Sequence, residues 1–137
     1  MGGIRSNVGP GVSSLARVRS IGAGTLAVLI LVQAFLAGRH LFGGLGITIH
    51  GVIGNAVFAV GVVLLAASLV RPREPIVIAA SASLTVLLTA QVGLGYAGRT
   101  NLDAAAWHIP NGVLSFGLAV YLATRRGPTT DVSRSST

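Results

Sequence analysis

The sequence contains no cysteine, no lysine and only three acidic residues, Glu74, Asp103 and Asp131. Without cysteine the chain can form no disulfide, thiolate metal site, iron–sulfur cluster or covalent c-type haem attachment. None of the acidic residues lies within an apolar run, so the chain provides neither paired carboxylates for catalysis nor a carboxylate proton relay within a membrane. The serines of the apolar runs have no base beside them, so nucleophilic catalysis has no support either.

Charged residues are scarce as well, at 9% of the chain against about 25% in ordinary soluble domains, while 52% of the residues are hydrophobic. The apolar residues form four runs of about 18–24 residues, each close to the length that crosses a bilayer. The sequence therefore predicts an all-α fold, a four-helix transmembrane bundle, with helices at about 18–39, 47–70, 76–98 and 104–124. We expect residues 1–17 to form a mobile tail and residues 125–137 to be a disordered tail.

The net charge of +7 comes from ten arginines whose positions follow a membrane topology. Eight lie before the first run, between the second and third runs or after the fourth, and only Arg39 and Arg99 lie in the two other loops. This bias predicts that both termini are cytoplasmic and that the other two loops face outward. Because membrane topology accounts for the positive charge, we expect no nucleic-acid partner. The absence of lysine beside abundant glycine, alanine, valine and arginine is typical of GC-rich bacteria. The predicted location is a bacterial plasma membrane, which the chain crosses several times.

Two halves of the chain resemble each other. Gln33 and His50 are 17 residues apart, and the same spacing recurs between Gln91 and His108, at an offset of 58 residues. Glutamine and histidine are rare in this chain, so their coincidence at one offset indicates a tandem duplication of a two-helix hairpin. Other residues that match at this offset are Leu26 with Leu84, Gly54 with Gly112, and Phe58 with Phe116.

The repeat places His50 and His108 at similar depth, near the outer ends of two helices. If the hairpins pack around a pseudo-two-fold axis, these histidines face each other inside the bundle, where four-helix proteins build cofactor sites. Two imidazoles with no thiolate or carboxylate beside them suit a b-type haem that is ligated on both faces. The expected cofactor is therefore haem b, with its iron bound by the two histidines. Gln33 and Gln91 could bond to the second imidazole nitrogens or to a propionate.

Arg39 and Arg99 lie at the expected outer rim, where haem propionates need cationic partners. For each of these residues a role without any cofactor is an open alternative. The histidines could be interfacial polar residues, the glutamines interhelical hydrogen-bond partners, and the arginines anchors at the headgroups.

Trp107 is expected in the interfacial aromatic belt. A zinc site is less suitable, because two histidines leave it short of ligands and Asp103 is the only carboxylate on the outer side.

Glycines follow Gln91 in a GxGxxG pattern that spans Gly93, Gly95 and Gly98. A dinucleotide site requires a preceding strand and a βαβ unit, whereas this pattern lies in a predicted membrane helix. The glycines are therefore expected to let another helix or a flat ligand come close.

The segment 91–95, followed by His108 at the next helix, resembles haem A synthase, a family of two four-helix halves that each carry two histidines. The present chain is similar to one such half over residues 20–124. The resemblance implies haem ligation by His50 and His108, and Gln91 with the glycines after it matches the family's pattern in the third helix. The family's glutamate, one turn before the first histidine, is replaced here by the segment 47–49, which contains no acid, and its outer-loop cysteine pair is absent. These departures argue against the synthase reaction. The chain also resembles small four-helix membrane proteins of GC-rich bacteria, which implies no function.

Three hypotheses follow. The first is a haem-binding membrane protein that transfers electrons or handles haem. The second is a cofactor-free membrane subunit that packs into a larger complex, and the third is a half-size haem A synthase that would need a second copy. The expected partners are the lipid bilayer and a homodimer or larger membrane complex.

Overall fold

A computed structural model describes residues 11–44, 46–70 and 74–125, with side chains described from residue 16 onward. The described chain is all-helical, as the apolar runs predict. Its four helices are α1 (Gly11–Leu41), α2 (Ile47–Leu69), α3 (Pro75–Ala97) and α4 (Leu102–Thr124). Pro75 begins α3 at a position where its missing N–H costs no helical hydrogen bond.

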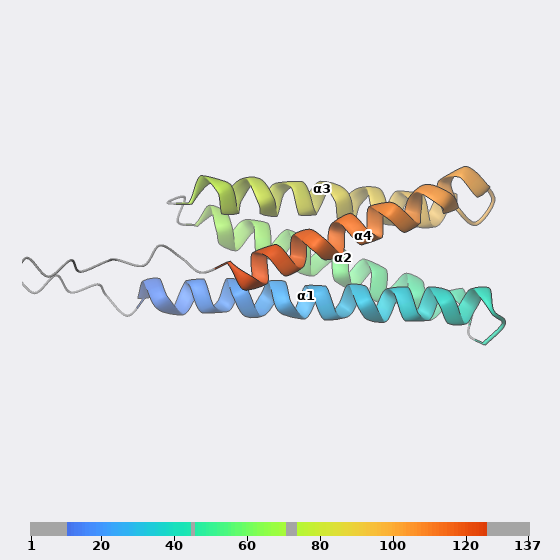
Figure 1. The fold of residues 1–137 in the computed structure, drawn as a ribbon, viewed down its shortest axis with the longest axis horizontal. Helices are drawn as coiled ribbons and strands as arrows, with labels where there is room; N and C mark the ends of the chain where they lie inside the picture. Colours follow the sequence, from blue (N-terminus) through green and yellow to red (C-terminus); the bar gives the residue numbers. More distant parts are fainter. Residues whose placement is uncertain (1–10, 45, 71–73, 126–137) are drawn as a thin grey trace, which may run out of the picture.

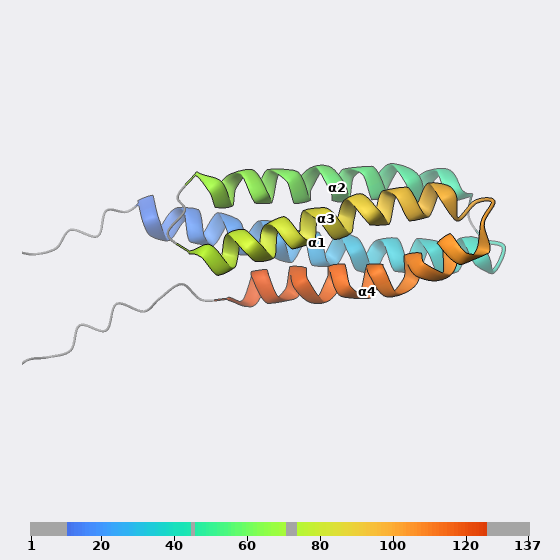
Figure 2. The same ribbon diagram turned by 90° about the horizontal axis from the view of Figure 1, so that it is seen from above.

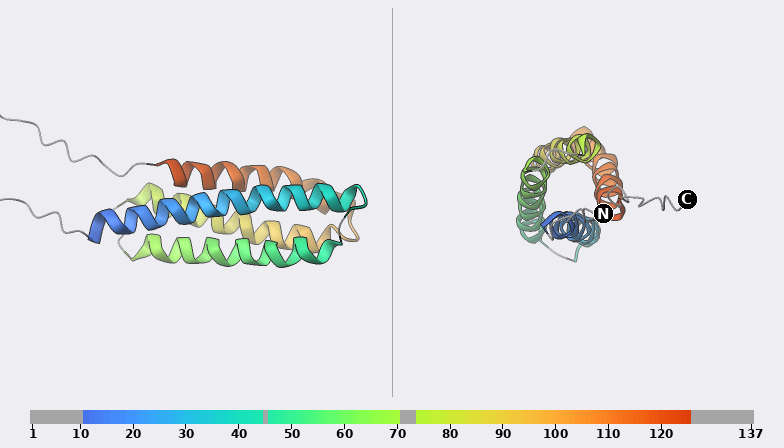
Figure 3. Two further views of the ribbon diagram at one scale, coloured as in Figure 1. Left: turned by 90° about the horizontal axis from the view of Figure 1, so that it is seen from below. Right: turned by 90° about the vertical axis from the view of Figure 1, so that its left-hand side faces the viewer.

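The four helices form a ring in which each helix packs against two neighbours (Figure 3, right). α1 contacts α2 and α4, and α3 contacts α2 and α4. The short connections α1–α2 and α3–α4 lie at one end of the bundle, which we call the loop end (Figures 1 and 2). Toward the loop end the two hairpins diverge, with α1 and α2 on one side and α3 and α4 on the other (Figure 1).

Two sequence-based boundaries need correction. α1 begins at Gly11, so residues 11–17 are helical and the helix starts seven residues before the predicted residue 18. The apolar stretch that could span a membrane begins only at Ala16, but nothing between Gly11 and Ala16 breaks a helix. α4 begins at Leu102, two residues before the predicted residue 104, because the side chain of its N-cap Asn101 accepts the backbone N–H groups of Asp103 and Ala104. The tail predicted at 125–137 lies, except for Arg125, outside the described residues.

Three of the four helices have the length and composition of membrane-spanning helices. α2 and α3, and α1 from Ala16 onward, are long and apolar enough to cross a bilayer. α4 is as long as α2 and α3, with 23 residues or about 34 Å of helix. It carries more strongly polar residues than they do and is therefore less apolar. Large apolar side chains also cover the outside of the bundle, among them Phe35 and Val86, as expected where lipid is the solvent.

The buried core residues occupy equivalent positions in the two sequence repeats. Six buried positions of the first hairpin recur 58 residues later as buried positions of the second. They are Ala23 and Ser81, Leu26 and Leu84, Ile30 and Leu88, Val57 and Ser115, Gly61 and Ala119, and Leu64 and Leu122. The two hairpins therefore use equivalent faces to build one core, which bears out the pseudo-two-fold arrangement.

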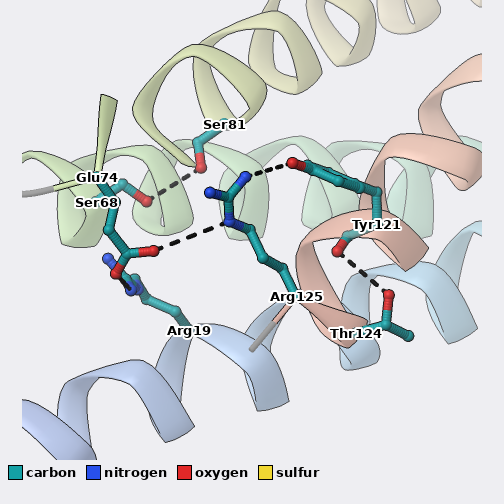
Figure 4. Close-up of polar contacts among 7 residues, drawn as sticks. All are labelled: Arg19, Ser68, Glu74, Ser81, Tyr121, Thr124 and Arg125. Atoms are coloured by element: carbon teal, nitrogen blue, oxygen red, sulfur yellow. Dashed lines mark hydrogen bonds and ion pairs between the residues drawn. The ribbon is translucent and has the colours of Figure 1, made fainter. Parts of the chain in front are cut away.

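A polar cluster joins the helices at the end opposite the loops (Figure 4). Glu74, which precedes α3, accepts a hydrogen bond from Arg19 of α1 at 2.7 Å, and Arg125 approaches its other oxygen at 4.0 Å. Arg125 also donates to the hydroxyl of Tyr121. Beside them the hydroxyls of Ser68 and Ser81 are 3.1 Å apart. This cluster links residues of all four helices, or of their ends, at the end opposite the loop end.

Candidate functional site

A cavity of about 420 Å³ lies between the two hairpins in the loop-end half of the bundle. All four helices line it, through the segments 30–41, 47–57, 88–99 and 108–116. Most of the lining is apolar, and a few polar side chains converge within it, which is the usual composition of a small-molecule site. Both histidines and both glutamines of the repeat are among the lining residues.

His50 of α2 and His108 of α4 face each other across this cavity. Their ring centroids are 6.0 Å apart and their planes are inclined by 59°. Both side chains are half-buried. Nδ1 of each ring is buried and has no hydrogen-bond partner among the described residues. Each imidazole thus has a ring nitrogen whose lone pair or proton is unused by the protein, and such groups are costly unless something else satisfies them.

The two glutamines occupy equivalent positions but make different hydrogen bonds. Gln91 Nε2 lies 3.0 Å from Nε2 of His108, so this glutamine contacts the imidazole. Gln33 Nε2 instead donates to the backbone carbonyl of His50 at 2.8 Å, and its Oε1 is buried without a partner. The predicted contact between glutamine and imidazole therefore forms in the second repeat only.

The difference between the repeats comes from Asn111, which the sequence analysis did not single out. Asn111 Nδ2 donates to the carbonyl of Leu87 at 2.9 Å and to Oε1 of Gln91 at 2.5 Å. The equivalent residue of the first repeat is Ile53, which has no polar atom to offer Gln33. One signal could have identified Asn111, because it lies three residues after His108 and therefore on the same helix face.

Glycines make room for the polar side chains of the site. A Cβ atom on Gly54 would lie 2.6 Å from Nε2 of Gln33, and one on Gly112 would lie 3.1 Å from Nε2 of Gln91. The repeated glycine thus opposes the repeated glutamine in both hairpins. A Cβ atom on Gly95 would be 3.1 Å from Cε1 of His108, so this glycine of the GxGxxG pattern lets the imidazole approach α3. The pattern lies within and just after α3, without the strand that a dinucleotide site needs.

The two arginines expected at the rim have different positions. Arg99 lines the cavity, and its guanidinium lies over the ring of Tyr96, with Cζ 4.7 Å from the ring centroid. Arg39 is exposed and is not among the lining residues, because its guanidinium folds back against Gly44 of its own loop. Of the two, only Arg99 is placed to meet a negative group of a ligand in the cavity.

The repeat relates cavity-lining positions of α2 and α3 to positions of α4 and α1 that differ in polarity. In α2 and at the end of α3, Asn55 donates to the hydroxyl of Tyr96 at 3.5 Å and Arg99 covers that ring. The residues at the equivalent positions are small or aliphatic: Val113 for Asn55, Gly38 for Tyr96, and Leu41 for Arg99. All six residues line the cavity, so at these positions its lining is more polar along α2 and α3 than along α1 and α4.

Other ligand types find less support among the described residues. No group of three or more histidine, cysteine, aspartate or glutamate side chains lies close enough there to hold a metal ion. Asp103 is exposed and is not among the lining residues. Trp107 is 68% exposed, as expected for an interfacial belt residue. Comparisons of the chain with protein-family models, with curated proteins and with solved structures give no match.

Proposed function

We propose that the chain is a haem-binding membrane protein that holds one b-type haem in the cavity at the loop end. The observation that carries this proposal is the pair of imidazoles, His50 and His108, which face each other across that cavity with centroids 6.0 Å apart. A metal–imidazole bond is about 2 Å long, so two rings on opposite sides of one ion have centroids roughly 6 Å apart. The spacing of the two rings supports the proposal that both would hold one metal ion.

The surroundings of the histidines support the same ligand. The cavity volume of about 420 Å³ and its largely apolar lining are suited to a macrocycle. Gly51 also lines it and would let a flat ring approach the backbone, because a Cβ atom there would have only the guanidinium of Arg99 within 4 Å. Arg99 would pair with a propionate. When bound, haem would supply one-electron redox chemistry, and the protein would supply the axial ligands, the apolar surroundings and the counter-charge.

The loop end would be the outer side of a bacterial plasma membrane, with the polar cluster of Figure 4 on the cytoplasmic side. The arginine distribution in the sequence supports this orientation, since eight of ten arginines lie before or at the start of the first apolar run, between the second and third runs, or after the fourth. The role that fits such a site is electron transfer or haem handling close to the outer face.

The two alternatives receive less support. A cofactor-free subunit would be expected to fill its interior with leucine, valine and phenylalanine, whereas this bundle contains a cavity lined by paired polar side chains. A half-size haem A synthase would need an acid near the haem edge. Asp103, the only outer candidate, is exposed and outside the lining.

A haem titration tests the proposal. Haem is added to the protein in mild detergent, and the Soret band is followed for the unmodified chain and for His50→Ala, His108→Ala and His40→Ala. We expect saturable uptake of one haem per chain, weakened at least tenfold by either cavity substitution. His40→Ala is the matched control, because His40 does not line the cavity. Equal uptake by all four proteins would show that haem partitions into the detergent and would contradict the proposal.

A further inference from the structure

The hydrogen bonds around Gln91 determine which of its amide atoms faces His108. The carbonyl of Leu87 can only accept, so the side-chain atom of Asn111 beside it must be the NH₂ group. That NH₂ group also contacts Gln91 at 2.5 Å, so the contacted atom of Gln91 must be its oxygen. The NH₂ group of Gln91 is then the atom that lies 3.0 Å from Nε2 of His108.

This order of donors and acceptors has a consequence for the imidazole. An amide NH₂ group can only donate, so Nε2 of His108 accepts its hydrogen and offers its lone pair to Gln91. In a neutral imidazole one nitrogen accepts and the other carries the proton, so the proton of His108 is on Nδ1. The chain from Leu87 through Asn111 and Gln91 therefore fixes one tautomer of His108.

His50 lacks this arrangement although it occupies the equivalent position. Gln33 donates to the backbone of His50 and not to its ring. Ile53 stands where the second repeat has Asn111, so no side chain orients the Gln33 amide in the same way. The two imidazoles are thus chemically different despite the symmetry of the helices.

We propose that Asn111 is a positioning residue that fixes the Gln91 amide as a donor to Nε2 of His108. This amide then competes with a metal ion for the lone pair of that nitrogen. In a site that takes haem, His50 would bind before His108, because the ring of His108 would first have to lose its hydrogen bond to Gln91. The tautomer of His108 belongs to the ligand-free protein, whereas the order of ligation rests on the proposed function.

The first test uses no haem. The protein is labelled with [¹⁵N]histidine, and long-range ¹H–¹⁵N spectra are recorded in detergent micelles at a pH at which the imidazoles are neutral. The chain has three histidines, and the signals of His108 are assigned by their loss in His108→Gln. We expect a single tautomer of His108 with the proton on Nδ1. Asn111→Leu and Gln91→Leu should each give a mixture of both tautomers.

Asn55→Leu is the matched control, because Asn55 bonds to Tyr96, and it should leave the His108 signals unchanged. A proton on Nε2 in the unmodified chain would overturn the proposal, as would an unchanged tautomer in both Asn111→Leu and Gln91→Leu. Helical circular dichroism of each variant shows that the bundle is intact. Two different substitutions keep the test decisive if one of them fails to fold.

The second test measures haem affinity. Removing one competing hydrogen bond should lower the dissociation constant about fivefold in Asn111→Leu and Gln91→Leu and should raise the low-spin fraction of the bound haem. An unchanged or higher dissociation constant would overturn the proposed competition. If the expected tautomer is found but no variant takes up haem, the proposed function fails and the positioning role of Asn111 stands.

Discussion

The ring centroids of His50 and His108 lie 6.0 Å apart, although 58 residues separate the two histidines in the sequence. Each histidine is near the start of the second helix of its hairpin, and the two hairpins pack with α2 and α4 on opposite sides of the ring of helices. A duplication of one hairpin therefore yields a pair of facing imidazoles without any further change. The predictions below follow from this arrangement.

The first prediction concerns the contact between Gln33 and Gly54. Gly54→Ala would place a methyl group where Nε2 of Gln33 lies and would displace the amide from the carbonyl of His50. Losing this hydrogen bond should cost about 1 kcal/mol. Gly117→Ala is the matched control, since a Cβ atom there would meet no atom within 4 Å. Thermal unfolding in detergent should show Gly54→Ala to be the less stable variant, and equal midpoints would contradict the predicted contact.

The second prediction concerns the ion pair between Arg19 and Glu74, whose side chains are only 14% and 18% exposed. Glu74→Gln would leave Arg19 without its carboxylate and without a link between α1 and α3. Because the pair is partly shielded from water, we expect a loss of about 1–3 kcal/mol, more than for a surface pair. Asp103→Asn removes a carboxylate from an exposed position and should change the unfolding midpoint much less. Equal effects of both substitutions would show that this ion pair contributes little.

The lengths of the apolar runs, the charge distribution and the repeat were sufficient to predict the helical fold and the equivalence of its two halves. The runs define α2 and α3 closely, because Gly46 precedes α2, Pro75 begins α3 and Gly98 follows it. The start of α1 at Gly11 was not predicted, since hydropathy reports where a helix could enter a membrane and not where helical hydrogen bonding begins.

The site was predicted in part, for a physical reason. The repeat identifies His50, His108 and their glutamines, because equal offsets imply equal depth. It could not show that Gln33 and Gln91 bond differently. That difference depends on Asn111, which has no polar counterpart at Ile53, and a search for symmetric residues overlooks residues that break the symmetry. Arg39 and Arg99 were treated as equivalent although the offset does not relate them, and only Arg99 lines the cavity.

The third prediction concerns the route by which haem would reach the cavity. Val113 lines the cavity and is 66% exposed, so it belongs both to the cavity wall and to the apolar surface. Val113→Trp should therefore obstruct passage from lipid at this position and slow haem transfer from lipid vesicles to the reconstituted protein severalfold. Val86→Trp is the matched control, because Val86 is 68% exposed on the apolar surface but does not line the cavity. Equal transfer rates for the two variants would exclude entry past Val113.

The most direct test of the central claim is a reduced-minus-oxidised visible spectrum of the protein purified in mild detergent, recorded beside His50→Ala and His108→Ala. If the two histidines ligate one b-type haem, the unmodified protein gives a sharp low-spin α band, and either substitution abolishes it. A colourless protein that takes up no added haem, or an α band that survives both substitutions, would contradict the account.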